Sequence, residues 1–254
     1  MDSENNYGAL EVQKGILDIL KRVDIICQDN SIPYSLLAGS LLGAIRHQGF
    51  IPWDDDADIV IDRSHYQKLQ QLLVSDPILM VTKMLWIDKI KLRVPSGQRK
   101  KSTVDLFVLD AVPSNRLLKR IKLFIVLVLQ RMIIDKPRYR DYSLVNRLIT
   151  WVLNTLGKVV GKKSLLRLYE RASMIANSKP SEYKAIYCDQ FRYIRNEYDA
   201  SILSSLSKVP FEDTALSAIS SYDKYLTQMY GDWRTPLSPE LRKGQHITLL
   251  SNDR

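Results

Sequence analysis

The sequence predicts an α/β (α+β) fold, with a small mixed sheet flanked by helices and a helical second half. Two observations predict this class. Before residue 115, short apolar runs rich in β-branched residues alternate with stretches of helical periodicity. After residue 115, long apolar stretches with helical spacing dominate. The 254 residues are enough for one large domain, or for one domain with an added lobe.

The first predicted element is a helix over residues 7–29. Its apolar residues follow at spacings of four, three and four, which places them on one helical face: Ile16, Leu20, Val23 and Cys27. The next elements are a strand at 32–37, a short helix at 40–47, a turn at 51–53 and a strand at 58–61. They are followed by a helix at 64–73 with Ser64 as its N-cap, a strand at 89–94, a turn at 96–102 and a strand at 104–109.

Four carboxylates occupy five positions at the entrance to the predicted strand 58–61: Asp54, Asp55, Asp56 and Asp58. Side chains alternate along a strand, so Asp56 and Asp58 are expected on one face, with Asp54 in the same phase. Asp55 is expected to point elsewhere, into solvent. Carboxylate oxygens favour Mg²⁺ or Mn²⁺, and the pattern therefore indicates a site for a hard cation.

Acidic runs are more often solvated loops, which is the alternative for these four residues. Three features favour a site. The small-residue turn Gly39-Ser40 lies upstream, the Asp-x-Asp alternation leads into a strand, and a further acid, Asp105, lies within a later apolar strand. Asp105 needs a partner if that strand is buried, and a metal shared with the first cluster would supply one.

These residues resemble the signature of the nucleotidyltransferase fold, in the order Ala38-Gly39-Ser40, Asp56-Ala57-Asp58 and Asp105. Within that superfamily, the segment GSLLGAIRHQGFIPWDDDADI is similar to the LicD family of phosphocholine and related phospho-alcohol transferases, which includes the fukutin-related proteins. The resemblance extends to residues 10–34, to the strand VDLFVLD, and to residues 209–212 and 222–246. It is weakest over residues 115–207.

The resemblance implies metal-dependent transfer of a phospho-alcohol, such as phosphocholine or phosphoribitol, from a CDP-alcohol to a glycan hydroxyl. CMP would be released, in the synthesis of a cell-surface polysaccharide or lipid-linked glycan. The expected catalytic residues are Asp56, Asp58 and Asp105, and the expected ligands of Mg²⁺ or Mn²⁺ are Asp54, Asp56, Asp58 and Asp105. Asp105 is expected to complete a second metal site, to act as general base, or both.

Six residues are expected to bind substrate: Gly39, Ser40, Arg46, Trp53, Lys89 and Lys91. A glycine and a helix N-terminus suit close approach to phosphate, and arginine matches phosphate oxygens. Trp53 would stack on a base or on an alkylammonium group. The alternatives are a surface ion pair for Arg46 and core packing for Trp53.

Three other functions stay open. A sugar-nucleotide glycosyltransferase could use the Asp-x-Asp pair, although no Rossmann-like nucleotide-binding half precedes the motif. A nucleotidyltransferase would use the same metals to attack the α-phosphate of a nucleoside triphosphate and would release pyrophosphate. A non-catalytic membrane adaptor would retain the catalytic fold but have no enzymatic activity. The sequence fixes neither the transferred alcohol nor the acceptor sugar.

The charge is concentrated in one segment. Residues 116–171 carry 14 basic and three acidic residues, which gives this segment a net charge of +11. The net charge of the chain is +9, so the residues outside the segment sum to −2. The segment is also apolar, and it predicts helices at 117–134 and 144–160. In the second helix a polar stripe recurs every four residues: Asn146, Thr150, Asn154 and Lys158.

Neither helix is expected to span a membrane, because the first carries five polar residues within its apolar stretch and both are short. We expect them to lie on an anionic membrane surface. The alternative is that they pack on each other and on the core, with solvated charges at the rim. Nucleic acid is not an expected partner, because the aromatic residues are not interleaved with the charges.

The predicted organisation is a nucleotidyltransferase-like catalytic core at 1–114, a basic apolar helical insert at 115–207 and a segment at 208–254 that closes the core. Cys27 and Cys188 both lie in apolar contexts and are expected to be buried free thiols. The polar N-terminus does not read as a signal peptide. A cytoplasmic protein, peripheral to the inner face of the cell membrane, is expected.

Overall fold

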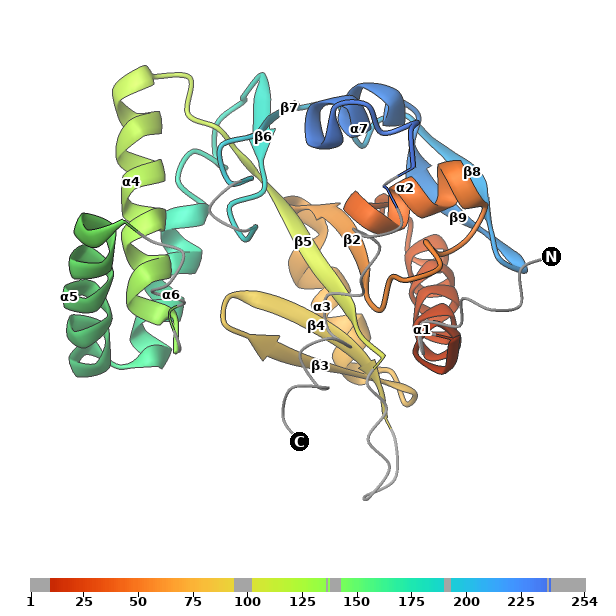
Figure 1. Cartoon of the computed structure of the whole chain (residues 1–254), viewed down its shortest axis with the longest axis horizontal. Coiled ribbons are helices and arrows are strands. Elements are labelled where there is room, and N and C mark those ends of the chain that lie inside the picture. Colours follow the sequence, from red (N-terminus) through yellow and green to blue (C-terminus); the bar gives the residue numbers. More distant parts are fainter. Residues whose placement is uncertain are drawn as a thin grey trace. The chain divides into compact units, whose positions relative to one another are not determined.

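A computed structural model of the chain describes residues 10–93, 102–135, 137, 143–189, 193–236 and 238. In chain order the elements are α1 (Leu10–Asp29), β1 (Tyr34–Leu36), α2 (Ala38–His47), β2 (Ala57–Asp62), α3 (Arg63–Ser75), β3 (Leu79–Met84), β4 (Ile87–Leu92), β5 (Val104–Ala111), α4 (Arg116–Ile133), α5 (Leu144–Val160), α6 (Lys162–Ser173), β6 (Tyr183–Ala185), β7 (Glu197–Asp199), β8 (Leu206–Phe211), β9 (Thr214–Ile219) and α7 (Tyr222–Tyr230) (Figure 1). The predicted mixed α/β class is confirmed.

The chain forms two compact units. The first takes residues Met1–Thr82, Asp88–Val108 and Ser201–Arg254, and the second takes Lys83–Ile87 and Leu109–Ala200. The predicted division at residues 114 and 207 remains a prediction. The predicted turn at 96–102 lies almost entirely outside the described residues.

The first unit is built on a sheet with strand order β1-β2-β5-β4-β3. β1 and β2 are antiparallel, with Ser35 opposite Val60, and β4 and β5 are antiparallel, with Lys89 opposite Asp105. β5 is buried along its whole length, as expected for a strand with neighbours on both sides and apolar residues on both faces. This burial explains why the strand reads VDLFVLDA.

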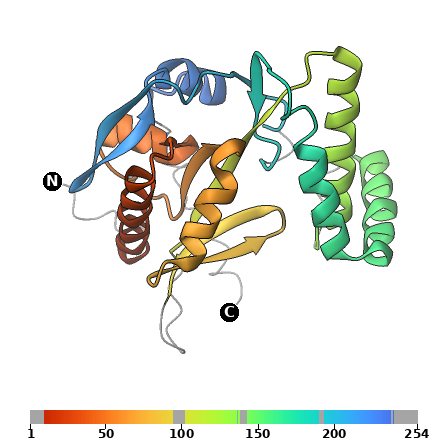
Figure 2. The same ribbon diagram turned by 180° about the vertical axis from the view of Figure 1, so that it is seen from behind.

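Helix α1 lies beside α3 and β9, and α3 packs against β2 (Figure 2). The predicted apolar face of α1 is confirmed, because its four apolar residues are all buried: Ile16, Leu20, Val23 and Cys27. The N-cap of α3 is Asp62, whose side chain accepts a hydrogen bond from the Ser64 N–H, so the prediction of Ser64 as N-cap is wrong. Asp62 still belongs to β2, and the helix starts directly from the strand.

A β8–β9 hairpin, which the sequence did not predict, completes the first unit. It packs against β1: the Ile219 N–H donates to Ser35 Oγ at 3.0 Å, and the Ser217 N–H donates to Tyr34 Oη at 3.4 Å. Phe211 is fully buried at the end of the hairpin and its ring meets Phe50 edge-on at 4.8 Å. The hairpin therefore reaches the loop that precedes the acidic cluster.

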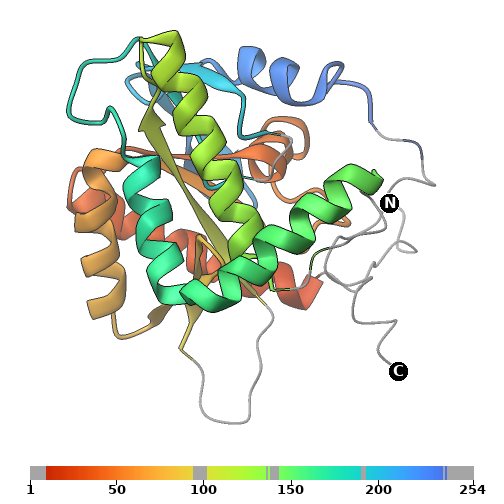
Figure 3. The same ribbon diagram turned by 90° about the vertical axis from the view of Figure 1, so that its left-hand side faces the viewer.

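In the second unit, α4 lies between α5 and α6 (Figure 3), and the end of β5 pairs with β6. The core of this unit is formed by residues of α4, α6 and the β6 region: Val126, Leu129, Ile133, Leu165, Tyr169 and Tyr187. Lys122 of α4 is fully buried in it, and its ammonium donates to the carbonyls of Ala111 and Ile175 at 2.7 and 2.8 Å. Among the described residues, none of the helices combines the length and the apolar character that a bilayer span requires.

Candidate functional site

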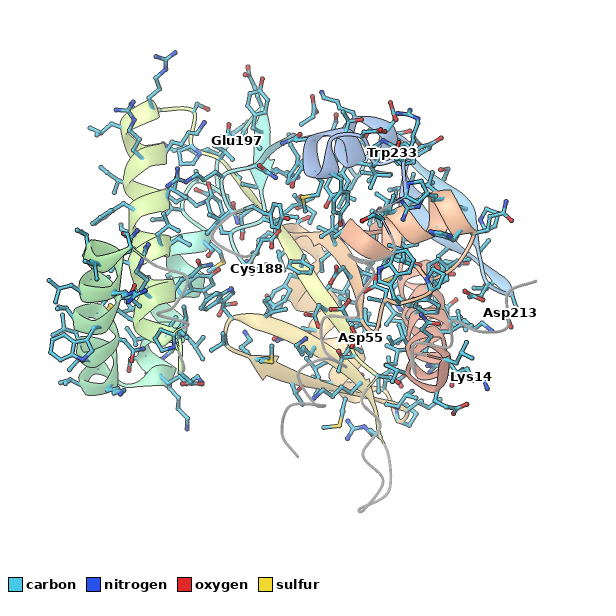
Figure 4. All side chains as sticks on the ribbon, viewed as in Figure 1. Lys14, Asp55, Cys188, Glu197, Asp213 and Trp233 are labelled. Carbon is cyan, nitrogen blue, oxygen red and sulfur yellow. The ribbon has the colours of Figure 1, made fainter. Side chains whose placement is uncertain are left out.

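The carboxylates of Asp54, Asp55 and Asp56 gather in the turn between α2 and β2. One oxygen from each lies within 4.8 Å of the others. Asp55 is only 4% exposed and lies between α1 and the sheet (Figure 4), so the expectation that it points into solvent is wrong. The reason is that β2 begins at Ala57. Strand alternation therefore does not extend back to the three acids.

The turn is held from α1. The Gln13 side chain donates to the carbonyls of Asp54 and Ile51 at 2.8 and 3.2 Å, and the Asp54 N–H donates to the Ile51 carbonyl at 2.9 Å. Gln13 was not a predicted site residue. The sequence does offer a sign of its role, because Gln13 is a polar residue three positions before Ile16 and therefore lies on the apolar face of the helix.

Burial, followed by repulsion from Asp56 and Asp55, raises the pKa of Asp54 to about 8. The cluster is thus unfavourable as three bare anions, and a cation would relieve it. All three donors are carboxylate oxygens, which suit Mg²⁺ or Mn²⁺ better than a soft metal. The residues present fit the predicted hard-cation site, with Asp55 as an additional donor.

Gly39 brings the start of α2 against this cluster. A Cβ atom at this position would lie 2.7 Å from Asp54 Oδ2, a distance that real Cβ contacts do not reach. Ala38 has a φ of 45°, in the left-handed region that non-glycine residues rarely adopt. The chain is therefore bent sharply where α2 begins, and the carboxylate of Asp54 occupies the space that a larger residue at position 39 would need.

Ser40 ties α2 to β2. Its hydroxyl oxygen accepts the Asp58 N–H at 2.9 Å, and the Leu37 N–H donates to the Asp58 carbonyl at 2.9 Å. Asp58 is half-buried on β2, outside the group of three acids whose oxygens converge. Its assignment as a metal ligand, like that of Asp105, stays a prediction.

Asp105 has a protein partner. Its two carboxylate oxygens lie 2.7 and 2.8 Å from Lys89 Nζ, and both residues are buried. The sequence predicted that Asp105 would need a partner, and the structure supplies the cation that faces it across the β4–β5 pair. Asp58 lies on β2 and Asp105 on β5, and these two strands are neighbours in the sheet.

The remaining predicted substrate residues are less closely grouped. Arg46 lies at the far end of α2 from Gly39, about 10 Å along the helix. Its guanidinium donates to the Trp233 carbonyl and to His47 Nε2, both at 3.1 Å. Trp53 and Lys91 are half-buried, the first directly before the acidic cluster and the second two positions after Lys89. Their roles stay predictions.

Glu212 was not a predicted site residue, although it lies in the segment 209–212 that carries part of the family resemblance. Its carboxylate accepts the Phe50 N–H at 2.9 Å, and its own N–H donates to the Gln48 carbonyl at 2.8 Å. A Cβ atom at Gly49 would lie 2.2 Å from the same carboxylate. The hairpin turn therefore clamps the loop that leads to Asp54. The contact joins residues 162 positions apart, and no local pattern signals it.

Residues 31–121 match the family model described as LicD/FKTN/FKRP, nucleotidyltransferase domain. The chain is also 26% identical over 260 residues to the lipopolysaccharide cholinephosphotransferase LicD of Haemophilus influenzae, an alignment that covers 93% of this chain and 95% of that protein. Together these two matches support the assignment of the chain to the LicD family. The resemblance drawn from the Gly-Ser turn and the Asp-x-Asp strand is thereby confirmed.

Two shorter matches involve uncharacterised proteins of Rickettsia. The chain is 43% identical over 58 residues to RP689 of Rickettsia prowazekii, which is 23% of this chain and 22% of that protein. It is 42% identical over 57 residues to RT0683 of Rickettsia typhi, which is 21% of this chain and 18% of that protein. All the predicted site residues lie inside the region that the LicD family model matches, and helices α5 and α6 lie outside it.

Proposed function

We propose that this LicD-family protein transfers phosphocholine from CDP-choline, or a related group such as phosphoribitol from its CDP-alcohol, to a hydroxyl of a glycan. The acceptor would belong to a cell-surface polysaccharide or a lipid-linked glycan. Two findings support the proposal: similarity over nearly the whole chain to a lipopolysaccharide cholinephosphotransferase, and three converging carboxylates beside the start of α2. The carboxylates are the observation that carries it, because phosphoryl transfer depends on charge neutralisation at the transferred group.

In the proposed reaction the acceptor oxygen attacks the phosphorus that bears the alcohol. A new oxygen–phosphorus bond forms while the bond from that phosphorus to the bridging oxygen breaks. CMP leaves with the electron pair, and the proton of the hydroxyl passes to a carboxylate. We assign this role to Asp105, whose orientation the ion pair with Lys89 fixes.

Asp54 and Asp56, together with Asp55, would hold a divalent cation, and Asp58 and Asp105 would complete the site. A bound Mg²⁺ or Mn²⁺ would offset the charge of the diphosphate and of the departing CMP. The mutually repelling carboxylates favour such binding, because a cation relieves the repulsion that, after burial, raises the pKa of Asp54.

Gly39 and Ser40 at the start of α2 would bind the donor phosphates. Leu37, which precedes this helix, makes no side-chain hydrogen bond to its first turn. Helix N-termini offer backbone N–H groups and a favourable dipole to phosphate. The further predicted contacts, from Arg46, Trp53, Lys89 and Lys91, belong to this proposal as well.

Nucleotidyl transfer is the second candidate, because the matched family model is described as a nucleotidyltransferase domain. The two reactions differ in their products. Incubation with Mg²⁺ and a panel of CDP-alcohols should release CMP if the first proposal is correct, and CDP-choline or CDP-ribitol should be preferred over UDP-sugars. Release of pyrophosphate from a nucleoside triphosphate, with no CMP from any CDP-alcohol, would favour the second candidate.

We also propose a cytoplasmic location, peripheral to the inner face of the cell membrane. The observation in support is the excess of basic residues between Arg116 and Arg171, a segment that contains 14 basic residues and only three acidic ones. The inner leaflet is negatively charged and attracts such segments. An enzyme at this surface would meet lipid-linked acceptors.

A further inference from the structure

Helix α5 packs with its polar side inward. Its buried residues are Thr150, Asn154 and Gly157, on one stripe of the helix. The Asn154 side-chain amide donates to the Ile134 carbonyl at the end of α4. A Cβ atom at position 157 would lie 2.1 Å from the Met132 carbonyl, so only glycine allows this close approach. Two residues of the predicted polar stripe, Thr150 and Asn154, thus form the contact of α5 with the rest of the second unit, while Asn146 and Lys158 are exposed.

The opposite side of α5 is apolar and exposed. With 3.6 residues per turn, the positions opposite the buried stripe carry six apolar side chains, all exposed: Leu144, Val145, Leu148, Val152, Leu156 and Val159. Leu144 is 80% exposed and Val159 is 84% exposed, nearly as in an unfolded chain. Thr155 is the one polar residue among them, and its hydroxyl donates to the Trp151 carbonyl within the same helix.

This arrangement is the reverse of the usual one. A surface helix of a water-soluble protein normally buries its apolar stripe and exposes its polar one. Contiguous exposed apolar faces mark contacts with another macromolecule or with a membrane. The six apolar side chains of α5 therefore require an apolar surrounding that the described residues of the second unit do not provide.

The edge of the exposed face carries a membrane-interface pattern. Arg147, Trp151 and Lys158 lie within about 40° of one another around the helix axis, along one border of the apolar face. All three side chains are exposed. Tryptophan favours the headgroup level of a bilayer, and basic residues there are attracted to anionic lipids. The same unit exposes further basic residues on α4 and α6: Arg116, Arg120, Lys163, Arg167 and Arg171.

We propose that α5 lies along the surface of an anionic bilayer, with its apolar face inserted at the level of the lipid headgroups and Trp151 at the edge of the inserted face. The charge of the unit decides between this partner and a second copy of the chain. Two copies joined through α5 would bring two strongly basic segments together, whereas an anionic surface complements them. The inference rests on the membrane location proposed above, but not on the transfer reaction.

The test is co-sedimentation of the purified protein with phosphatidylcholine vesicles that contain phosphatidylglycerol, across a salt series. The test variant replaces three exposed apolar residues, as Leu148→Ser, Val152→Ser and Leu156→Ser together. The matched control replaces three exposed apolar residues of the first unit, as Ile25→Ser, Val74→Ser and Ile78→Ser. We expect the test variant to lose at least about tenfold in vesicle binding, and the control to bind as wild type does.

The position of Trp151 in the bilayer can be measured separately, by fluorescence quenching. Lipids brominated near the headgroup should quench part of the wild-type tryptophan fluorescence, and this quenching should be absent in Trp151→Phe. Three results would overturn the proposal: wild type that stays in the supernatant at low salt, a triple variant that sediments as wild type does, or a wild-type dimer that the triple variant dissociates without any vesicle binding. Release of CMP from soluble CDP-choline should persist in the triple variant, so failure of the docking and failure of the reaction are distinguishable.

Discussion

Lys89 and Asp105 neutralise each other inside the sheet of the first unit, with the ammonium nearly equidistant from the two carboxylate oxygens. A buried charge that loses its partner is strongly destabilising, whereas an apolar pair of similar size is often tolerated. Each residue therefore has a structural role in addition to the proposed catalytic one.

We predict that Lys89→Met lowers the free energy of unfolding by about 3 kcal/mol, and that adding Asp105→Leu restores most of it. Urea denaturation of both variants and wild type measures this. The double variant should be folded but unable to release CMP. A single variant as stable as wild type would show that the ion pair does not hold the sheet together.

Gly39 determines how closely α2 approaches the acidic cluster. A methyl group there would meet Asp54 Oδ2 at 2.7 Å and force the carboxylate to move. We predict that Gly39→Ala weakens Mn²⁺ binding, followed by calorimetric titration, by more than about tenfold, because metal sites tolerate little displacement of a donor. Thermal unfolding of the same variant serves as the control. An unchanged Mn²⁺ affinity of the Gly39→Ala variant would contradict the assignment of Asp54 as a metal ligand.

Cys27 lies on the buried face of α1, and burial, followed by the nearby Asp24 carboxylate, raises the pKa of its thiol to about 12. The thiolate is the reactive form, so at pH 8 only about one thiol in 10⁴ is ionised. We predict that iodoacetamide leaves Cys27 unmodified at pH 8 in the folded Cys188→Ser variant and alkylates it in urea. Rapid labelling of the folded variant would contradict the burial.

At the scale of elements, Asp76 joins the end of α3 to α1 and β3. Its carboxylate accepts hydrogen bonds from Arg22 at 2.8 Å and from the N–H groups of Ile78 and Leu79, both at 2.9 Å. Burial alone would raise the pKa of Asp76, but these hydrogen bonds outweigh it and the pKa lies below its ordinary value. The ionised form is thus the one that stabilises the fold.

Asp76→Asn should therefore lower the free energy of unfolding at pH 7 by about 1–3 kcal/mol. A lowered pKa contributes stability above the unfolded value, near pH 4, and loses it as the pH falls through the folded value. The difference between variant and wild type should then shrink in acid. Denaturation curves measured from pH 7 to pH 3 test this, and a difference independent of pH would contradict it.

The elements that the sequence predicted well have a strong local pattern. The limits of α5 were predicted as observed, and the buried face of α1 follows from its apolar spacing. The β8–β9 hairpin and the clamp by Glu212 were missed, because they depend on contacts between distant parts of the chain. Asp55 was assigned wrongly because strand alternation was applied to residues that form a turn.

At the scale of the whole molecule, the predicted site residues and the basic charge belong to different units. The predicted site residues lie on elements of the first unit, within the match to the LicD family model, while the basic excess and the inverted helix α5 belong to the second. The sequence predicted both the polar stripe and the charge. It could not tell which side of α5 would be buried, because that depends on the close approach of Gly157 to α4.

The central claim is that the carboxylates of Asp54, Asp55 and Asp56 support metal-dependent transfer from a CDP-alcohol. The most direct measurement is CMP release from CDP-choline with an acceptor glycan, in wild type and in Asp56→Asn, with EDTA and after Mg²⁺ is restored. We predict that wild type loses all activity in EDTA and regains it with Mg²⁺, and that the folded Asp56→Asn variant is inactive throughout. Full activity of wild type in EDTA would contradict the account.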